Sequence, residues 1–163
     1  MGTFFDRVQD LEPGEYPSDE GTYRTASGQL FRVVAEPDYD VPLEDAEDSY
    51  GRVEYRDDRD ARRARPEGFD GAARKIDLRN GFLWWQPPAD AIADPDLLRT
   101  MRAAVRDIAE YGYKVATVEL LAPEPDHYGR PIVVNAASVG AIEPFDEIGP
   151  FVRDLIGELE IEI

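Results

Sequence analysis

The sequence predicts an α+β fold in which a mainly antiparallel sheet carries two amphipathic helices on one face. Short strand-like runs separated by turn signals occupy much of the chain, and helical periodicity is confined to residues 94–112 and 147–158. The 163 residues are 42% hydrophobic, which suffices for a single domain over residues 1–163. Residues 1–20, which prolines interrupt, are expected to lie at its periphery.

The first predicted element is a β-hairpin. Strand-like runs at residues 22–26 and 29–35 flank Ser27-Gly28, a dipeptide typical of two-residue turns between antiparallel strands. The acidic residues 36–50 that follow contain prolines and predict a loop.

Three further strands are predicted in the middle of the chain, at residues 52–55, 73–78 and 82–85. The first strand leads into residues 56–70, which begin with a charged run that has no apolar face to bury and therefore predicts a mobile, loop-like region. The other two strands are joined by Arg79-Asn80-Gly81, whose Asn-Gly pair accommodates the positive φ that tight hairpin turns require.

The clearest helical signal begins at Asp94-Pro95, an N-cap acid followed by a proline at the first helical position, and it ends at Gly112. A second helix is predicted over about residues 147–158. Each helix has one apolar stripe for packing against the sheet. The stripes consist of Leu97, Leu98, Met101, Val105 and Ile108 in the first helix and of Ile148, Phe151, Val152, Leu155, Ile156 and Leu159 in the second.

Two strands near the second helix are almost continuously apolar. They cover residues 113–121 and 132–139, and this pattern predicts central positions in the sheet with burial on both faces. Residues 159–163 alternate between apolar and acidic side chains, which predicts a short edge strand at the C-terminus.

The formal net charge is −17, and it is unevenly distributed. Residues 1–50 carry a net charge of −10 and residues 141–163 one of −6, whereas residues 51–80 carry +2 and residues 81–140 carry −3. A surface dominated by carboxylates repels the phosphates of nucleic acids, so direct nucleic-acid binding is not expected.

Several classes of function lack their sequence signals. The chain has no cysteine, no signal-peptide pattern and no apolar run long enough to span a membrane, which predicts a cytoplasmic protein. No glycine-rich phosphate-binding loop or dinucleotide fingerprint follows any predicted strand, and no catalytic constellation stands out. We therefore expect no cofactor and favour a non-enzymatic role.

The densest carboxylate cluster of the chain lies within residues 36–48. Its members are Glu36, Asp38, Asp40, Glu44, Asp45, Glu47 and Asp48. An EF-hand is excluded because Pro42 occupies the place of the third ligand and no glycine follows at the required position. The weak candidate ligands for a hard cation in another arrangement are Asp38, Asp40, Asp126 and His127, the only histidine.

The segment from Phe82 to Pro88 has an unusual composition, with two adjacent tryptophans before a Pro-Pro pair. On a strand, Trp84 and Trp85 point to opposite faces. Both rings can be core residues, or one can be exposed and serve as a hot spot for a partner.

Three stretches carry a resemblance to other proteins: residues 48–55 (DSYGRVEY), 84–88 (WWQPP) and 128–138 (YGRPIVVNAAS). They resemble small acidic proteins of unassigned function encoded by phages of GC-rich actinobacteria. The resemblance implies no catalytic residues. It implies a small accessory protein that acts on a component of the host cell, in the host cytoplasm.

Three functional hypotheses follow. The first is a non-enzymatic binding module, an inhibitor that imitates nucleic acid and occupies the basic cleft of a host protein. Its partner-binding residues are Asp38, Asp40, Glu44, Asp45, Glu47, Asp48, Trp84 and Trp85. The second is a cation-dependent enzyme of phosphate chemistry that uses the carboxylates of residues 36–48, with Arg62, Arg63 or Arg65 as the phosphate ligand. The third is a structural subunit that pairs with another chain through residues 159–163.

Overall fold

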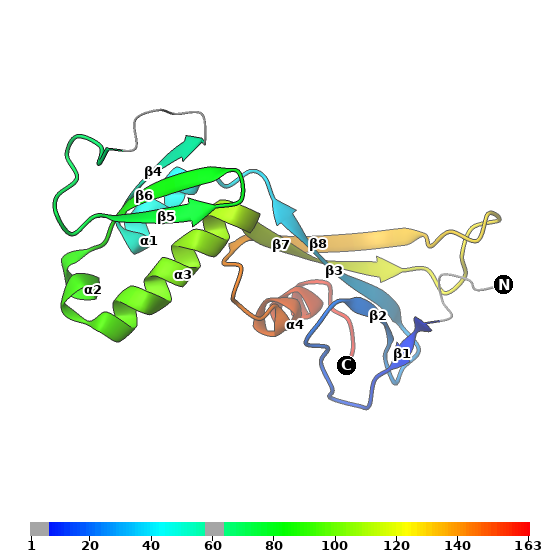
Figure 1. Cartoon of the computed structure of the whole chain (residues 1–163). Coiled ribbons are helices and arrows are strands. Elements are labelled where there is room, and N and C mark those ends of the chain that lie inside the picture. Colours follow the sequence, from blue (N-terminus) through cyan, green and yellow to red (C-terminus); the bar gives the residue numbers. More distant parts are fainter. Residues whose placement is uncertain (1–6, 58–63) are drawn as a thin grey trace. The chain divides into compact units, whose positions relative to one another are not determined.

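The computed structural model describes residues 7–57 and 64–163, and it contains two compact units, each with its own sheet. The first unit consists of the residues up to Pro37, Lys114–Ile142 and Asp146–Ile163. The second unit consists of Asp38–Tyr113 and Glu143–Phe145. The α+β class is confirmed, with the strands divided between two sheets and one of the two predicted amphipathic helices beside each (Figure 1).

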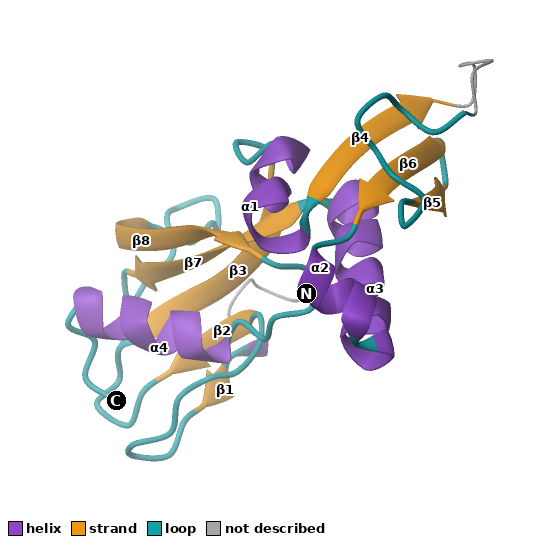
Figure 2. Ribbon diagram, turned by 90° about the vertical axis from the view of Figure 1, so that its left-hand side faces the viewer, coloured by secondary structure: helices purple, strands orange, loops and turns teal. Residues whose placement is uncertain are grey.

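The first unit contains a five-stranded sheet in the order β1-β2-β3-β7-β8. Its strands are β1 (Gln9–Asp10), β2 (Gly21–Arg24), β3 (Leu30–Asp38), β7 (Tyr113–Leu121) and β8 (Val133–Ile142). The pairs β2–β3 and β7–β8 are antiparallel, whereas the short β1 runs parallel to β2. Helix α4 (Gly149–Glu158) lies along one face of this sheet (Figure 2).

The core of the first unit forms between this sheet face and α4. Apolar side chains recur at every second residue along the strands and at every third or fourth residue along the helix. Each element therefore presents one apolar face to the other. The buried side chains include Phe31 and Val33 of β3, Ala116 and Val118 of β7, and Val152, Leu155 and Ile156 of α4. Leu11, close to β1, joins the same cluster and fixes part of the N-terminal segment that was expected to be peripheral.

The predicted hairpin between β2 and β3 is confirmed, but its loop is longer than expected. Residues 25–29 form it, closed by a hydrogen bond from the Thr25 amide to the Gln29 carbonyl at 2.9 Å. The Thr25 hydroxyl accepts a bond from the Gln29 amide at 3.1 Å and contacts the Ser27 hydroxyl. Gly28 supplies the positive φ of 94° in this loop. The threonine hydroxyl therefore closes a wider turn than the Ser-Gly dipeptide alone predicts.

The two apolar strands β7 and β8 exist, but the prediction that both are central is wrong for β8. It is the last strand of the sheet, and most of its residues are exposed. β7 alone is central, between β3 and β8. A run of small and β-branched apolar residues fits an exposed edge as well as a buried strand, so the composition did not distinguish the two.

The predicted C-terminal edge strand is also wrong, since no strand follows α4. Instead, the amide of Glu160 bonds to the Gly157 carbonyl and the amide of Ile161 to the Ile156 carbonyl, both at 3.1 Å. This pair of bonds is a Schellman cap, in which Glu160 has a left-handed φ of 57°. Ile161 is buried beside Ile156, so the alternating pattern reflects helix capping.

Replacement of Glu160 by glycine is expected to raise the free energy of unfolding by about 1 kcal/mol, because a side chain is unfavourable in the left-handed region. Glu158→Gly is the matched control: it removes the same side chain two residues earlier, inside α4, and should lower stability by about 1 kcal/mol. Urea denaturation of both variants checks the prediction. Equal effects of the two substitutions would contradict it.

The second unit contains a three-stranded antiparallel sheet in the order β4-β6-β5. Its strands are β4 (Arg52–Asp57), β5 (Arg74–Leu78) and β6 (Gly81–Gln86), and helix α3 (Pro95–Tyr111) contacts β5. Asp94 caps α3, with its side chain accepting from the amides of Asp96 and Leu97, as predicted. The short helix α2 (Ala89–Ala93) precedes it.

The hairpin between β5 and β6 is confirmed, but its turn differs from the expected one. Leu78 pairs with Gly81, so Arg79 and Asn80 form the two-residue loop, and no positive φ occurs at Asn80 or Gly81. Two side chains hold the loop instead. The Arg79 amide donates to Glu110 Oε1 at 2.7 Å, and the Tyr55 hydroxyl donates to the Asn80 carbonyl at 3.0 Å.

Two segments that were predicted as loops have different outcomes. Within residues 36–50, β3 continues to Asp38, and the 3-10 helix η2 (Leu43–Ala46) and helix α1 (Glu47–Tyr50) follow, so the loop prediction is wrong there. Residues 64–70 contain only turns and irregular chain, as expected, whereas Arg56 and Asp57 still belong to β4, so the loop prediction is wrong for these two residues. The rest of the charged run, residues 58–63 with Arg62 and Arg63, lies outside the described residues.

Candidate functional site

Residues 38–50, here called the acidic segment, belong to the second unit and carry the carboxylates of positions 38–48. Helices η2 and α1 form one continuous helical stretch within it. Its inward side chains are Ala46 and Tyr50, which are buried in the core, and Leu43, which packs against it. Its outward side chains are Glu44, Asp45, Glu47 and Asp48, all exposed. The apolar residues therefore anchor a helical surface whose exposed side chains are these four acids and Ser49.

No ion pair within the described part of the chain neutralises these four carboxylates. Glu44 and Asp48 are four residues apart, and Glu44 and Glu47 three apart, so they are neighbours on the helix surface. Like charges at these spacings destabilise a helix by about 0.2–0.5 kcal/mol per pair. Among the described residues, no base forms an ion pair that offsets this repulsion within the segment.

The field of the acidic segment acts on a buried neighbour. Tyr113 is buried in the core of the second unit, and burial raises the pKa of its hydroxyl. The carboxylates of Glu143 and Asp45 raise this pKa further, since both disfavour a phenolate. Asp38 lies at the start of the segment, where its Oδ1 accepts from the Asp40 amide at 3.2 Å.

The two tryptophans lie on opposite faces of β6. Trp85 is fully buried in the core of the second unit, and its indole Nε1 donates to the Tyr50 carbonyl at 2.5 Å. Trp84 is half-buried on the other face, opposite Lys75 of β5 and Glu54 of β4. Its indole nitrogen is buried and has no hydrogen-bond partner among the described residues. Trp85 also connects the sheet directly to the end of α1.

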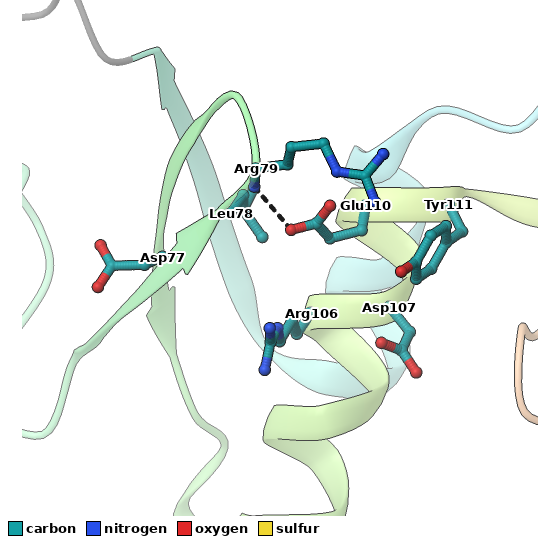
Figure 3. A pocket seen from close by; sticks show the side chains of 7 residues that line it. All are labelled: Asp77, Leu78, Arg79, Arg106, Asp107, Glu110 and Tyr111. Carbon is teal, nitrogen blue, oxygen red and sulfur yellow. Dashed lines mark hydrogen bonds between the residues drawn. The ribbon is translucent and has the colours of Figure 1, made fainter.

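The second unit has a groove between β5 and α3. Two adjoining hollows of about 430 and 400 Å³ share Asp77, Arg106 and Asp107. Figure 3 shows the first hollow, with the Glu110 carboxylate turned toward the backbone of Arg79. The second hollow adds Arg99 and Arg102 from α3. Both hollows are lined by arginines and acids, so the groove is a surface of mixed charge.

The described lining of the groove contains no serine–histidine or cysteine–histidine pair. Its described lining contains no histidine, serine, threonine or lysine, and Asp77 forms an ion pair with Lys75 at 3.6 Å. Neither the acidic segment nor Arg65 lines it. The combination of carboxylates and phosphate-binding arginines that the enzyme hypothesis requires is therefore not assembled in this groove.

Asp126 and His127 lie in the loop between β7 and β8, in the first unit. Asp126 Oδ1 accepts from the amides of Tyr128 and Arg130 at 2.9 and 2.8 Å, and Oδ2 lies 3.4 Å from Arg130 Nε. The rings of His127 and Tyr128 are in contact, with centroids 3.9 Å apart and planes tilted by 42°. The Asp126 carboxylate therefore organises its own loop.

The bond from the Arg130 amide is the main cause that lowers the pKa of Asp126, and the Tyr128 amide and the Arg130 guanidinium lower it further. A lowered pKa in the folded state contributes stability above the ordinary aspartate pKa, which is lost as pH falls through the lowered value. We expect the amides of Tyr128 and Arg130 to lose exchange protection in that acidic window. Asp126→Asn should abolish this pH dependence, as NMR-detected amide exchange can test.

The described residues contain no cluster of three or more His, Asp or Glu side chains placed to hold a metal ion. Asp38 and Asp40 belong to the second unit, and Asp126 and His127 belong to the first. In the same part of the chain, no helix is both long and apolar enough to cross a membrane.

Comparisons of the chain with protein-family models, with curated proteins and with solved structures find no match. The function is therefore inferred from the geometry and charge of the chain itself. The sequence identified the acidic segment and both tryptophans, but not the groove. One sequence pattern could have indicated the groove: Arg99, Arg102 and Arg106 are spaced three and four residues apart, which places them along one side of α3.

Proposed function

We propose that the protein is a non-enzymatic binding module whose acidic segment recognises a basic, nucleic-acid-binding protein. The observation that supports this most directly is the set of exposed, unneutralised carboxylates on an anchored helical surface: Glu44, Asp45, Glu47 and Asp48. Carboxylates held in this way can take the place of phosphates in a basic cleft.

The four carboxylates lie close enough together to act as one charged surface. Side chains three or four positions apart on a helix have Cβ atoms about 5–6 Å apart. This is less than the Debye length of about 8 Å at 0.15 M salt, so the four carboxylates act together on an approaching partner. At 1 M salt the Debye length is about 3 Å, and the charges no longer act together. Association is therefore expected to be fast and sensitive to salt.

Further observations support the proposal. Ala46 and Tyr50 fix the helical stretch to the core, so little conformational entropy is lost when a partner binds. Residues 38–50 contain six acids and no base, so the whole segment adds to the attraction. The resemblance to phage-encoded proteins favours a protein of the host cell as the partner.

An affinity experiment tests the proposal. The immobilised protein is incubated with a bacterial lysate treated with nuclease, at low salt and at about 1 M salt. We expect it to capture basic, nucleic-acid-binding proteins at low salt only, and added duplex DNA should release them by competition. Capture that survives high salt, or that DNA does not displace, would contradict recognition by an acidic surface.

A further inference from the structure

Strand β8 is a long, open edge of the five-stranded sheet. Within the described part of the chain its only strand neighbour is β7, and the opposite edge of the sheet is β1, which has two residues. An edge strand presents a row of backbone N–H and C=O groups to which another strand can pair. β8 is therefore the edge at which this sheet can be extended.

Proteins usually protect such edges with charged side chains or prolines, and β8 has neither. Residues 131–142 contain no ionisable side chain, in a chain of which 33% of the residues are charged. Val133 and Val134 are 42% and 57% exposed. The nearest acid on β7, Glu119, lies 2.6 Å from Arg32 in an ion pair and is neutralised. The edge is thus uncharged and, apart from Asn135 and Ser138, apolar.

Two irregularities limit the part of β8 that can pair regularly. The register with β7 shifts between Lys114 and Ala116 and again between Leu120 and Leu121, and in both places β8 holds the extra residue. Bulges of this kind twist an edge and interrupt pairing. Between them, residues 135–139 follow β7 without interruption.

A side-chain bond indicates which backbone groups of this stretch face outward. The Ala136 amide donates to Asn135 Oδ1 at 3.0 Å, so it points away from β7. In an antiparallel strand, alternate residues direct both their N–H and C=O to the same side. Ala136 and Ser138 therefore present their backbone groups at the open edge, whereas Asn135, Ala137 and Val139 bond to β7.

We propose that β8 pairs antiparallel with β8 of a second copy of the chain, across a two-fold axis at Ala137. In this register Ala136 faces Ser138 of the other copy, and each such pair exchanges two backbone hydrogen bonds. Ala137 faces Ala137 in a pair without hydrogen bonds, where side chains approach most closely and small ones fit. Asn135 then faces Val139, so no charges of like sign meet.

The charge distribution favours a second copy over a basic partner at this edge. A basic strand would find no carboxylate on β8, and its charges would be attracted to the acidic surfaces elsewhere on the chain. A second copy brings an equally uncharged strand, so this is the edge at which two chains of net charge −17 can approach closely. The two-fold arrangement uses β8 of both copies and closes at a dimer.

Sedimentation velocity over a range of concentrations and salt tests the pairing. We expect the mass to rise from that of one 18.3 kDa chain to twice that value, and salt to promote the rise because it screens repulsion. This salt dependence is opposite to that of the proposed partner binding, so the two proposals can fail separately. Ala136→Pro removes an outward N–H and should keep the chain monomeric, whereas the control Ala136→Ser keeps the N–H and should dimerise.

A cysteine pair tests the register, since the chain contains no cysteine of its own. Ala137→Cys should form a disulfide-linked dimer on mild oxidation, because the two Cα atoms of such a pair lie about 4.5 Å apart. Ala136→Cys is the matched control and should not, because it faces Ser138 of the other copy. A single-chain mass under all conditions, dimerisation of a folded Ala136→Pro variant, or equal cross-linking of the two cysteine variants would overturn the proposal.

Discussion

Replacement of Trp85 by alanine is expected to lower the free energy of unfolding by about 3–5 kcal/mol. Trp85 is fully buried among Val105 and Ile108 of α3 and Val53 of β4, so its removal leaves a cavity in the core of the second unit. The substitution also removes the hydrogen bond from the indole to the Tyr50 carbonyl. A loss of this size is a large part of the 5–15 kcal/mol that typically stabilises a domain, and urea denaturation measures it.

Trp84 provides the matched control, because it is the same residue type one position earlier on the same strand. It is half-buried, and its indole nitrogen has no partner among the described residues. Trp84→Phe removes that buried donor and should be neutral or stabilising, whereas Trp85→Phe should destabilise. Equal losses for the two phenylalanine variants would show that the assignment of one ring to the core and one to the opposite face is wrong.

Neutralisation of Glu44, Asp45, Glu47 and Asp48 to the corresponding amides should slow association with the basic partner by on the order of tenfold or more. Charges at the rim of an interface mainly determine how fast two proteins meet, so dissociation should change less. The fold should be retained and slightly stabilised, because the substitutions relieve repulsion at helical spacings. Stopped-flow kinetics and urea denaturation measure the two effects.

The matched control neutralises four exposed carboxylates in the first unit: Glu124, Glu147, Asp154 and Glu158. Both variants change the net charge by the same amount. If the acidic segment forms the binding surface, the control should slow association much less than the segment variant does. Equal slowing would mean that total charge, and not this surface, determines the rate.

Much of the fold could be predicted because the local signals and the packing agree. Asp94, Pro95 and Gly112 bound α3 as the sequence predicts. The near-continuous apolar run of β7 corresponds to a central strand. In these segments capping, periodicity and burial all favour one structure.

The errors arose where one pattern fits two structures. Residues 159–163 alternate as an edge strand would, but the alternation places Ile161 in the core after a helix cap. β8 is apolar enough for a central strand, and only the order of strands makes it an edge. The division into two sheets also depends on long-range pairing, such as that of β4 with β6, which local periodicity does not encode.

The acidic segment could be located from composition, but its form could not. The sequence counts carboxylates, whereas the structure shows that Ala46 and Tyr50 bury one side of a helical stretch and turn the acids outward. Few apolar residues are available in so short a stretch to reveal helical periodicity. Tertiary packing therefore determines the shape of the surface.

The central claim is that the acidic segment recognises its partner electrostatically. The most direct measurement is the association rate constant with the captured partner, determined from low to high salt for the wild-type chain, the segment variant and the matched control. The account predicts a steep fall with salt for the wild type and the control, and a slow rate with a shallow salt dependence for the segment variant. The same rate and the same salt dependence for the segment variant and the wild type would contradict it.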